Sequence, residues 1–164
     1  PDRGGDEARF KEANEAYDTL KNKNKRQHKS VRNYIDIEKE NKLDKIETYY
    51  KFAKDVNNIK LKSLKKLNNI LLENKKIIGY GAPAKATTVL NYFGIDDNYF
   101  QYVLEDSEIK HNKYIPETNI QIKSKNEINV DKYEYILVLA WNFFEAIVDN
   151  NKTKFKKSKF IKLK

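Results

Sequence analysis

The sequence contains no cysteine, no methionine and only two histidines. The missing cysteines exclude disulfide bonds, thiolate zinc sites and a cysteine nucleophile. His28 and His111 alone do not support a histidine-rich metal site or a Ser-His-Asp triad, so we predict no catalytic residue and no metal ligand. No apolar run approaches the roughly 20 residues that a membrane-spanning helix needs. We therefore expect no membrane segment and a cytoplasmic location.

Arginine is also scarce, with 4 residues against 29 lysines, and the net charge of +9 is unevenly distributed. Residues 1–33 carry a net +3, residues 34–150 carry −1, and residues 151–164 carry +7. Basic chain ends can attract phosphates. Lysine and asparagine together make up 48 of the 164 residues, however, which indicates a bias of composition. The lysines of residues 151–164 also alternate with apolar residues, as in an edge strand, so nucleic-acid binding is not expected.

Apolar residues recur at helical spacing in the first part of the chain. Asp6 can cap a helix over residues 9–20, and residues 37–74 show the same three- to four-residue repeat. No glycine or proline interrupts residues 37–74. This region forms either one long helix or two helices with a break near Asn57–Asn58. We divide the chain into a helical segment (1–33), a linking helix or helices (34–74) and a domain over residues 75–164.

Strands alternate with helices over residues 75–164. A strand ends at Ile77–Ile78, and a glycine-rich loop leads into a helix over residues 84–92 that Gly94 closes. The remaining elements are strands at 100–106, 119–124 and 133–141, a helix at 142–150 and an edge strand at 159–163. This order predicts the α/β class, with a small, mostly parallel, doubly wound sheet, flanking helices and an α-helical N-terminal segment.

The glycine-rich loop over residues 79–85 gives the strongest local signal for ligand binding. It connects a buried strand to a helix, where backbone N–H groups and the helix dipole attract anions. Lys85 could contact a phosphate, with Thr87 or Thr88 as a hydroxyl donor. The loop lacks the third glycine of a dinucleotide fingerprint. A tight turn without a ligand therefore fits the pattern equally well.

Polar residues follow two of the predicted strands. Glu105-Asp106 ends the second strand, where nucleotide-binding α/β folds place an acid on a ribose hydroxyl. A solvated pair of carboxylates is an equal alternative. Trp141 and Asn142 end the buried strand at the same edge of the sheet. Asn142 is a candidate polar contact for a ligand, and Trp141 is either a surface on which a ligand stacks or a core residue. His111 lies in a polar loop and is expected at the surface.

Three blocks of the sequence together resemble a known family. They read IIGYGAPAKATTVLNYFGI, YVLEDSEIKHNKYIPETNIQI and YILVLAWNF, and their order and content resemble the C-terminal domain of sugar C-methyltransferases over residues 49–163. The resemblance implies a Rossmann-like domain that helps to hold a nucleotide-linked sugar. It places these residues at the substrate: Tyr80, Gly81, Ala82, Pro83, Ala84, Lys85, Thr87, Asp106, Tyr114 and Asn142.

The sequence also departs from the family pattern at several positions. Ala86 stands in place of a glycine, and Asn112 and Glu117 replace two loop glycines. Asparagine tolerates positive φ, but Glu117 at such a position suggests a rearranged loop. In these enzymes S-adenosylmethionine and zinc are bound by other domains, whose motifs the 164 residues do not contain. We therefore expect ligand binding without methyl transfer, and no cofactor in this chain.

The first 30 residues resemble a second family. PDRGGDEARFKEANEAYDTL is similar to the end of the HPD loop and helix III of a J-domain, the module that stimulates ATP hydrolysis by the seventy-kilodalton heat-shock chaperone. The loop histidine would precede Pro1, so we expect a fragment of a longer protein. The alternative function is then a co-chaperone whose α/β domain binds a client or partner, with the heat-shock chaperone as its own partner.

Overall fold

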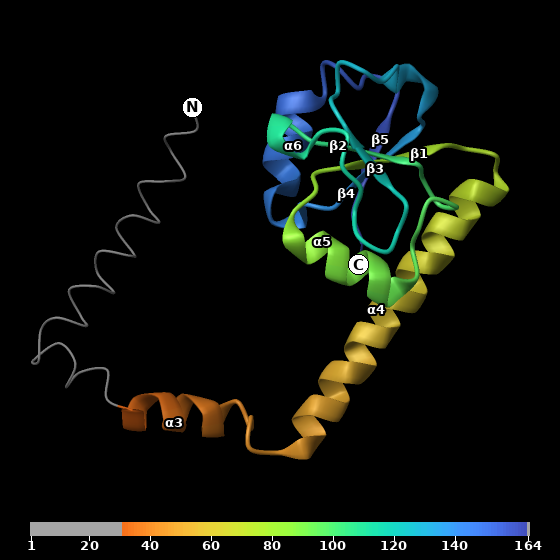
Figure 1. Cartoon of the computed structure of the whole chain (residues 1–164). Helices are drawn as coiled ribbons and strands as arrows, with labels where there is room; N and C mark the ends of the chain where they lie inside the picture. Colours follow the sequence, from red (N-terminus) through yellow and green to blue (C-terminus); the bar gives the residue numbers. More distant parts are fainter. Residues whose placement is uncertain (1–30, 164) are drawn as a thin grey trace, which may run out of the picture. The chain divides into compact units, whose positions relative to one another are not determined.

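A computed structural model describes residues 31–163 of the chain (Figure 1). The chain divides within one helix into two units, residues 1–53 and residues 54–164. The helix predicted over residues 9–20 and the J-domain resemblance of residues 1–30 lie outside the described residues.

Two helices precede the sheet, α3 (Val31–Glu40) and α4 (Ile46–Leu72). The chain leaves α3 through a turn in which Lys42 has a φ of 55°. The side chains of Thr48 and Tyr49 donate hydrogen bonds of 2.7 Å back to the carbonyls of Lys42 and Leu43, respectively, and fix the start of α4. The helix then runs unbroken through Asn57–Asn58, so the alternative of a break there was wrong.

The core of the second unit is a five-stranded sheet with the order β3-β2-β1-β4-β5. Every neighbouring pair is parallel, which confirms the predicted α/β class. The first strand continues two residues beyond the predicted end at Ile77–Ile78, because Gly79 and Tyr80 pair with β2 and β4. The bounds are β1 (Ile77–Tyr80), β2 (Tyr102–Leu104), β3 (Gln121–Lys123), β4 (Tyr135–Val138) and β5 (Lys159–Ile161).

Helices cover both faces of this sheet (Figure 1). On one face, Leu67 and Ile70 of α4 and Leu90 of α5 (Ala84–Phe93) join a buried cluster with Leu137 and Ile161. On the other face, α6 (Phe144–Asn151) packs on a second cluster around the strand residues of β1 and β4. Short 3-10 turns complete the unit: η1 (Glu108–Lys110), η2 (Val130–Lys132) and η3 (Trp141–Phe143).

Glycine closes α5 as the sequence predicts. Gly94 has a φ of 74°, and its N–H bonds to the carbonyls of Leu90 and Asn91. Left-handed φ suits glycine because no Cβ opposes it.

The outer edge of β3 is covered by its own preceding loop. The N–H of Asn112 donates to the carbonyl of Ile122, the N–H of Ile122 donates to the carbonyl of Lys113, and Tyr114 forms an antiparallel bridge with Gln121. The chain turns back between these two segments at residues 116–119. Among the described helices none is both long and apolar enough to cross a bilayer.

Candidate functional site

The carboxyl ends of β1 and β4 form the topological switch point of the sheet, because β1 continues toward β2 and β4 continues toward β5. Ligands of open α/β sheets bind in the crevice at such a point. Gly81 lies there with a φ of 82°. A Cβ on Gly81 would lie 2.9 Å from the Cβ of Ala140, so both the backbone conformation and the close approach require glycine.

Glu105, directly after β2, holds the loop that follows β1. One carboxylate oxygen accepts the N–H of Ala82 at 2.9 Å, and the other accepts the N–H groups of Asp106 at 3.0 Å and Ser107 at 3.2 Å. Lys110 bridges the same partners, donating to Glu105 at 3.2 Å and to the carbonyl of Ala82 at 3.1 Å. Burial raises the pKa of Glu105, but these hydrogen bonds outweigh it and hold the pKa below its usual value. The Glu105 carboxylate therefore accepts the N–H of Ala82, which is one of the loop N–H groups that we expected to attract the anion of a ligand.

Lys85 and Trp141 meet at the switch point. Lys85 lies in the first turn of α5, and Trp141 follows β4. The Lys85 ammonium lies 4.4 Å from the centre of the Trp141 ring, within the range of a cation–π contact. The tryptophan is half-buried and not part of either core cluster. A positive charge and an aromatic surface are thus held together beside the helix N-terminus.

A cavity of about 140 Å³ lies between α5 and the segment that covers β3. The predicted residues Ala82, Pro83, Thr87 and Tyr114 line it. The Asn91 amide spans the two walls, donating to the carbonyls of Thr87 at 2.9 Å and Pro116 at 3.1 Å. The volume is well below the 300 Å³ at which pockets for whole drug-sized ligands begin. The cavity therefore has room for a single ring or group of a larger ligand.

Tyr80 and Asp106 lie on the opposite face of the sheet from α5. The Tyr80 hydroxyl donates to Asp106 at 2.9 Å and lies 3.4 Å from the side-chain oxygen of Asn151 in α6. Burial, followed by the Asp106 carboxylate, raises the pKa of Tyr80 far above its usual value. Burial raises the pKa of Asp106, but Lys125 at 2.9 Å and the Tyr80 hydroxyl outweigh it, so the pKa is lowered. Tyr80 therefore stays protonated.

The ten predicted residues thus fall into four places. Four line the small cavity, Gly81 and Lys85 lie beside it at the switch point, and Tyr80 and Asp106 lie on the other face. Ala84 and Asn142 are exposed at the surface. Glu105 and Lys110 were not among the ten. The acid pair after β2 indicated Glu105, whereas no motif or spacing indicated Lys110.

Three residues of the loop before β3 have a left-handed backbone, and two of them, Asn112 and Glu117, stand in place of glycines of the family pattern. Asn112 has a φ of 61°, Glu117 of 63° and Asn119 of 56°. These values belong to the small region that glycine enters freely and asparagine tolerates. Glu117 therefore has a backbone conformation that favours glycine, and the loop rearrangement that the sequence suggested stays a prediction.

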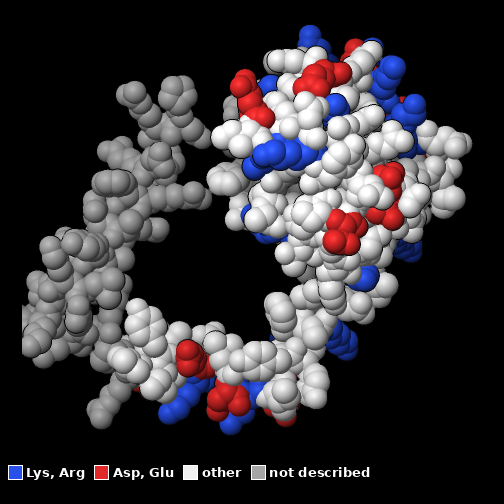
Figure 2. Space-filling model, in the orientation of Figure 1, with Lys and Arg blue, Asp and Glu red and all other residues white. Residues whose placement is uncertain are grey.

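The described residues do not fit a zinc site, because no three of their His, Asp or Glu side chains gather closely enough to hold a metal ion. Acidic and basic side chains are interspersed on the face of the described chain shown in Figure 2.

Two comparisons relate the chain to known proteins. A family model described as the C-methyltransferase C-terminal domain matches residues 14–163. The C-methyltransferase NovU of Streptomyces niveus is 27% identical over 104 residues, which are 63% of this chain. The matched part is 25% of that protein's length, so the chain spans about a quarter of this relative.

Proposed function

Since the chain belongs to the family of C-methyltransferase C-terminal domains, we propose that its α/β unit binds the phosphate-bearing substrate of such an enzyme. The ligand class is a nucleotide-linked sugar or a related phosphate ester. The proposed role of residues 54–163 is to hold this substrate. Methyl transfer is proposed to depend on S-adenosylmethionine and zinc bound by other domains.

The contact between Lys85 and Trp141 carries the proposal. The ammonium group lies at the N-terminal turn of α5, where the helix dipole also favours negative charge. A diphosphate there would gain a point charge and backbone N–H donors. The half-buried ring of Trp141 offers a surface for a base or a sugar face.

The small cavity is the proposed place for one ring of the ligand. Its walls combine the apolar surfaces of Pro83, Ile115 and Pro116 with the hydroxyls of Thr87 and Tyr114. Apolar walls with a few polar groups are typical of sites that orient a small ring. Because the cavity holds only part of a nucleotide-sugar, we expect weak binding by this domain alone.

Titration of the chain with dTDP-glucose by isothermal calorimetry tests the proposal. We expect Lys85→Ala to weaken binding about tenfold, since it removes a charge-assisted contact. Lys132→Ala is the matched control, because Lys132 is an exposed lysine just before β4, at the other edge of the sheet. This control should bind as the unchanged chain does.

Two results would contradict the proposal: the absence of heat of binding at millimolar dTDP-glucose, or equal affinity in the Lys85→Ala and unchanged chains. Trp141→Leu gives an independent check, since it removes the aromatic surface and keeps an apolar side chain. We expect it to weaken dTDP-glucose more than inorganic pyrophosphate, which has no ring to stack.

A further inference from the structure

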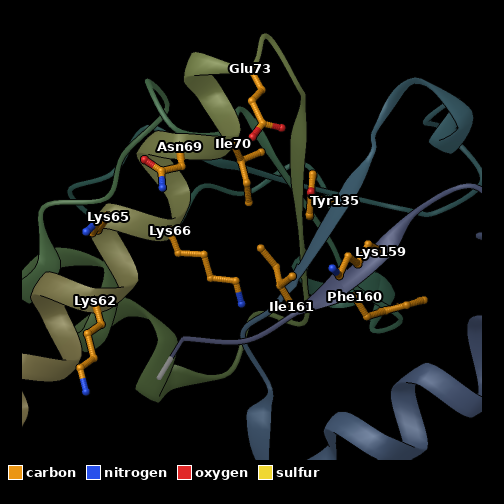
Figure 3. A pocket seen from close by; sticks show the side chains of 10 residues that line it. All are labelled: Lys62, Lys65, Lys66, Asn69, Ile70, Glu73, Tyr135, Lys159, Phe160 and Ile161. Atoms are coloured by element: carbon orange, nitrogen blue, oxygen red, sulfur yellow. The ribbon is translucent and has the colours of Figure 1, made fainter.

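A second and larger pocket lies along β5, the last strand of the sheet, and shares no lining residue with the site above. Tyr135 and Lys159, the first residues of β4 and β5, are paired in register and line it. The last turns of α4 and the residue that follows the helix, residues 62–73, form the other wall (Figure 3). The cavity volume is about 480 Å³, inside the range of pockets that hold small organic ligands.

Four lysines line this pocket: Lys62, Lys65 and Lys66 from α4, and Lys159 from β5. Within residues 31–163 none of the four forms an ion pair. The only acidic residue in the lining, Glu73, pairs instead with Lys75 at 2.5 Å. The positive charge of the pocket is therefore not neutralised by the described part of the chain.

Lys66 and Lys159 face each other across the pocket. The side chain of Lys66 extends from α4 toward Ile161, and the amino group of Lys159 lies on the side of β5 that faces it (Figure 3). Both side chains are exposed, but partial desolvation lowers the pKa of Lys66, and the positive charge of Lys159 lowers it further. Two ammonium groups brought together in this way repel each other, and an anion between them would remove the repulsion.

The floor of the pocket is apolar. Ile70 and Ile161 belong to the buried cluster beneath α4, and Tyr135 packs on the same cluster with its ring half-buried. A free inorganic anion has no apolar group that could pack on this surface. A ligand with both a phosphate group and a ring would use the lysines and the apolar floor together.

We propose that this pocket binds a small organic diphosphate of nucleotide size, with its phosphates between Lys66 and Lys159 and its ring on Ile70, Ile161 and Tyr135. The site is separate from the one proposed at the switch point, and its ligand need not be the enzyme's substrate. Lys62 and Lys65 add long-range attraction from the adjoining turns of α4.

The test is isothermal calorimetry of the full chain with sodium pyrophosphate and with ADP, at about 50 mM salt to limit screening. The Lys85→Ala chain serves as the starting protein, because it weakens the switch-point site about tenfold, and the effects of Lys66→Gln and Lys159→Gln on that background report on the second pocket alone. We expect both probes to bind, and ADP to bind more tightly because its ring reaches the apolar floor. Lys66→Gln and Lys159→Gln should each weaken pyrophosphate about tenfold.

Lys54→Gln is the matched control, since Lys54 is an exposed lysine of the same helix outside the pocket. It should change the affinity by less than about twofold, as expected for a distant, screened charge. Equal loss in Lys54→Gln and Lys66→Gln would overturn the proposal in favour of attraction by net charge. So would pyrophosphate binding tighter than ADP, or a single-stranded oligonucleotide binding far tighter than either through the same lysines.

Discussion

Glu117 carries a side chain in a backbone conformation that favours glycine. Its φ of 63° lies in the left-handed region, where contact between Cβ and the following carbonyl costs about 1–2 kcal/mol. The residue lies in the turn that returns the chain along the outer edge of β3, next to a wall of the small cavity. The backbone strain at Glu117 therefore lies in the loop that lines the small cavity.

Glu117→Gly is expected to stabilise the protein by about 0.5–1 kcal/mol, because the relieved contact exceeds the entropy that glycine adds to the unfolded chain. Urea unfolding monitored by circular dichroism measures the change. Asn119→Gly, at a φ of 56°, is the control and should give a smaller gain, since asparagine tolerates this region. A loss of stability in Glu117→Gly would mean that its side chain contributes more than the strain removes.

Glu105 makes the stability of the loop after β1 depend on pH. Its pKa is lower in the folded chain than the ordinary value of 4.5. The stabilisation is therefore complete above about pH 4.5 and is lost as the pH falls through the lower, folded value. At pH 7 we expect Glu105→Gln to lower the free energy of unfolding by about 1–2 kcal/mol, as for hydrogen bonds to a charged group.

Urea unfolding at pH 7 and pH 3 tests this expectation, and the difference between Glu105→Gln and the unchanged chain should shrink at pH 3. Glu108→Gln is the control, an exposed carboxylate in the same loop. An equal difference at both pH values would show that the carboxylate's charge does not support the loop.

Residue chemistry was predictable where it follows from the backbone. The sequence predicts that a glycine ends α5 and that a lysine lies in its first turn, and the structure has Gly94 and Lys85 at these positions. The direction of Tyr80 was not predictable. In a strand, successive side chains point to opposite faces, and the sequence does not say which face α5 covers. The phenol consequently faces α6, away from Lys85.

At the scale of elements, α4 shows which part of a long helix stabilises the fold. Leu67 is 1% exposed and belongs to the buried cluster, whereas Leu61 on the same helix is 57% exposed. Leu67→Ala should cost about 3 kcal/mol through lost burial and a cavity, while Leu61→Ala should change the stability by less than about 0.5 kcal/mol. Thermal unfolding of both variants measures the contrast, and similar losses would show that α4 packs through a different face.

The bounds of helices were less predictable than their existence. For residues 37–74, which contain no glycine or proline, we predicted either one long helix or two helices with a break near Asn57–Asn58. The break instead covers residues 41–45, where Lys42 has a left-handed φ and local hydrogen bonds from the side chains of Thr48 and Tyr49 fix the turn. Local propensity could not reveal a break made by side chains several residues further along the chain.

At the scale of the whole molecule, the described core depends on the later part of the chain. Among residues 33–163 the first buried side chain is Ser63, and the buried members of both core clusters begin at Leu67. We expect a chain shortened to begin at Ile46 to unfold within about 3 °C of the full chain in calorimetry. A larger drop would show that residues 1–45 stabilise the second unit. The J-domain resemblance of residues 1–30 stays a prediction.

The outer edges of the two outermost strands, β3 and β5, differ in whether another segment covers them. Loop residues 112–115 cover the outer edge of β3, while β5 is the last strand in the order and no described segment pairs with its other side. Growth of a fibre by strand addition needs two open edges in every molecule, because each copy must accept one neighbour and offer a second. Within residues 31–163 the outer backbone groups of β5 have no such cover, so strand addition would begin at β5. The loop over β3 thus keeps the backbone groups of β3 itself from pairing with a second copy.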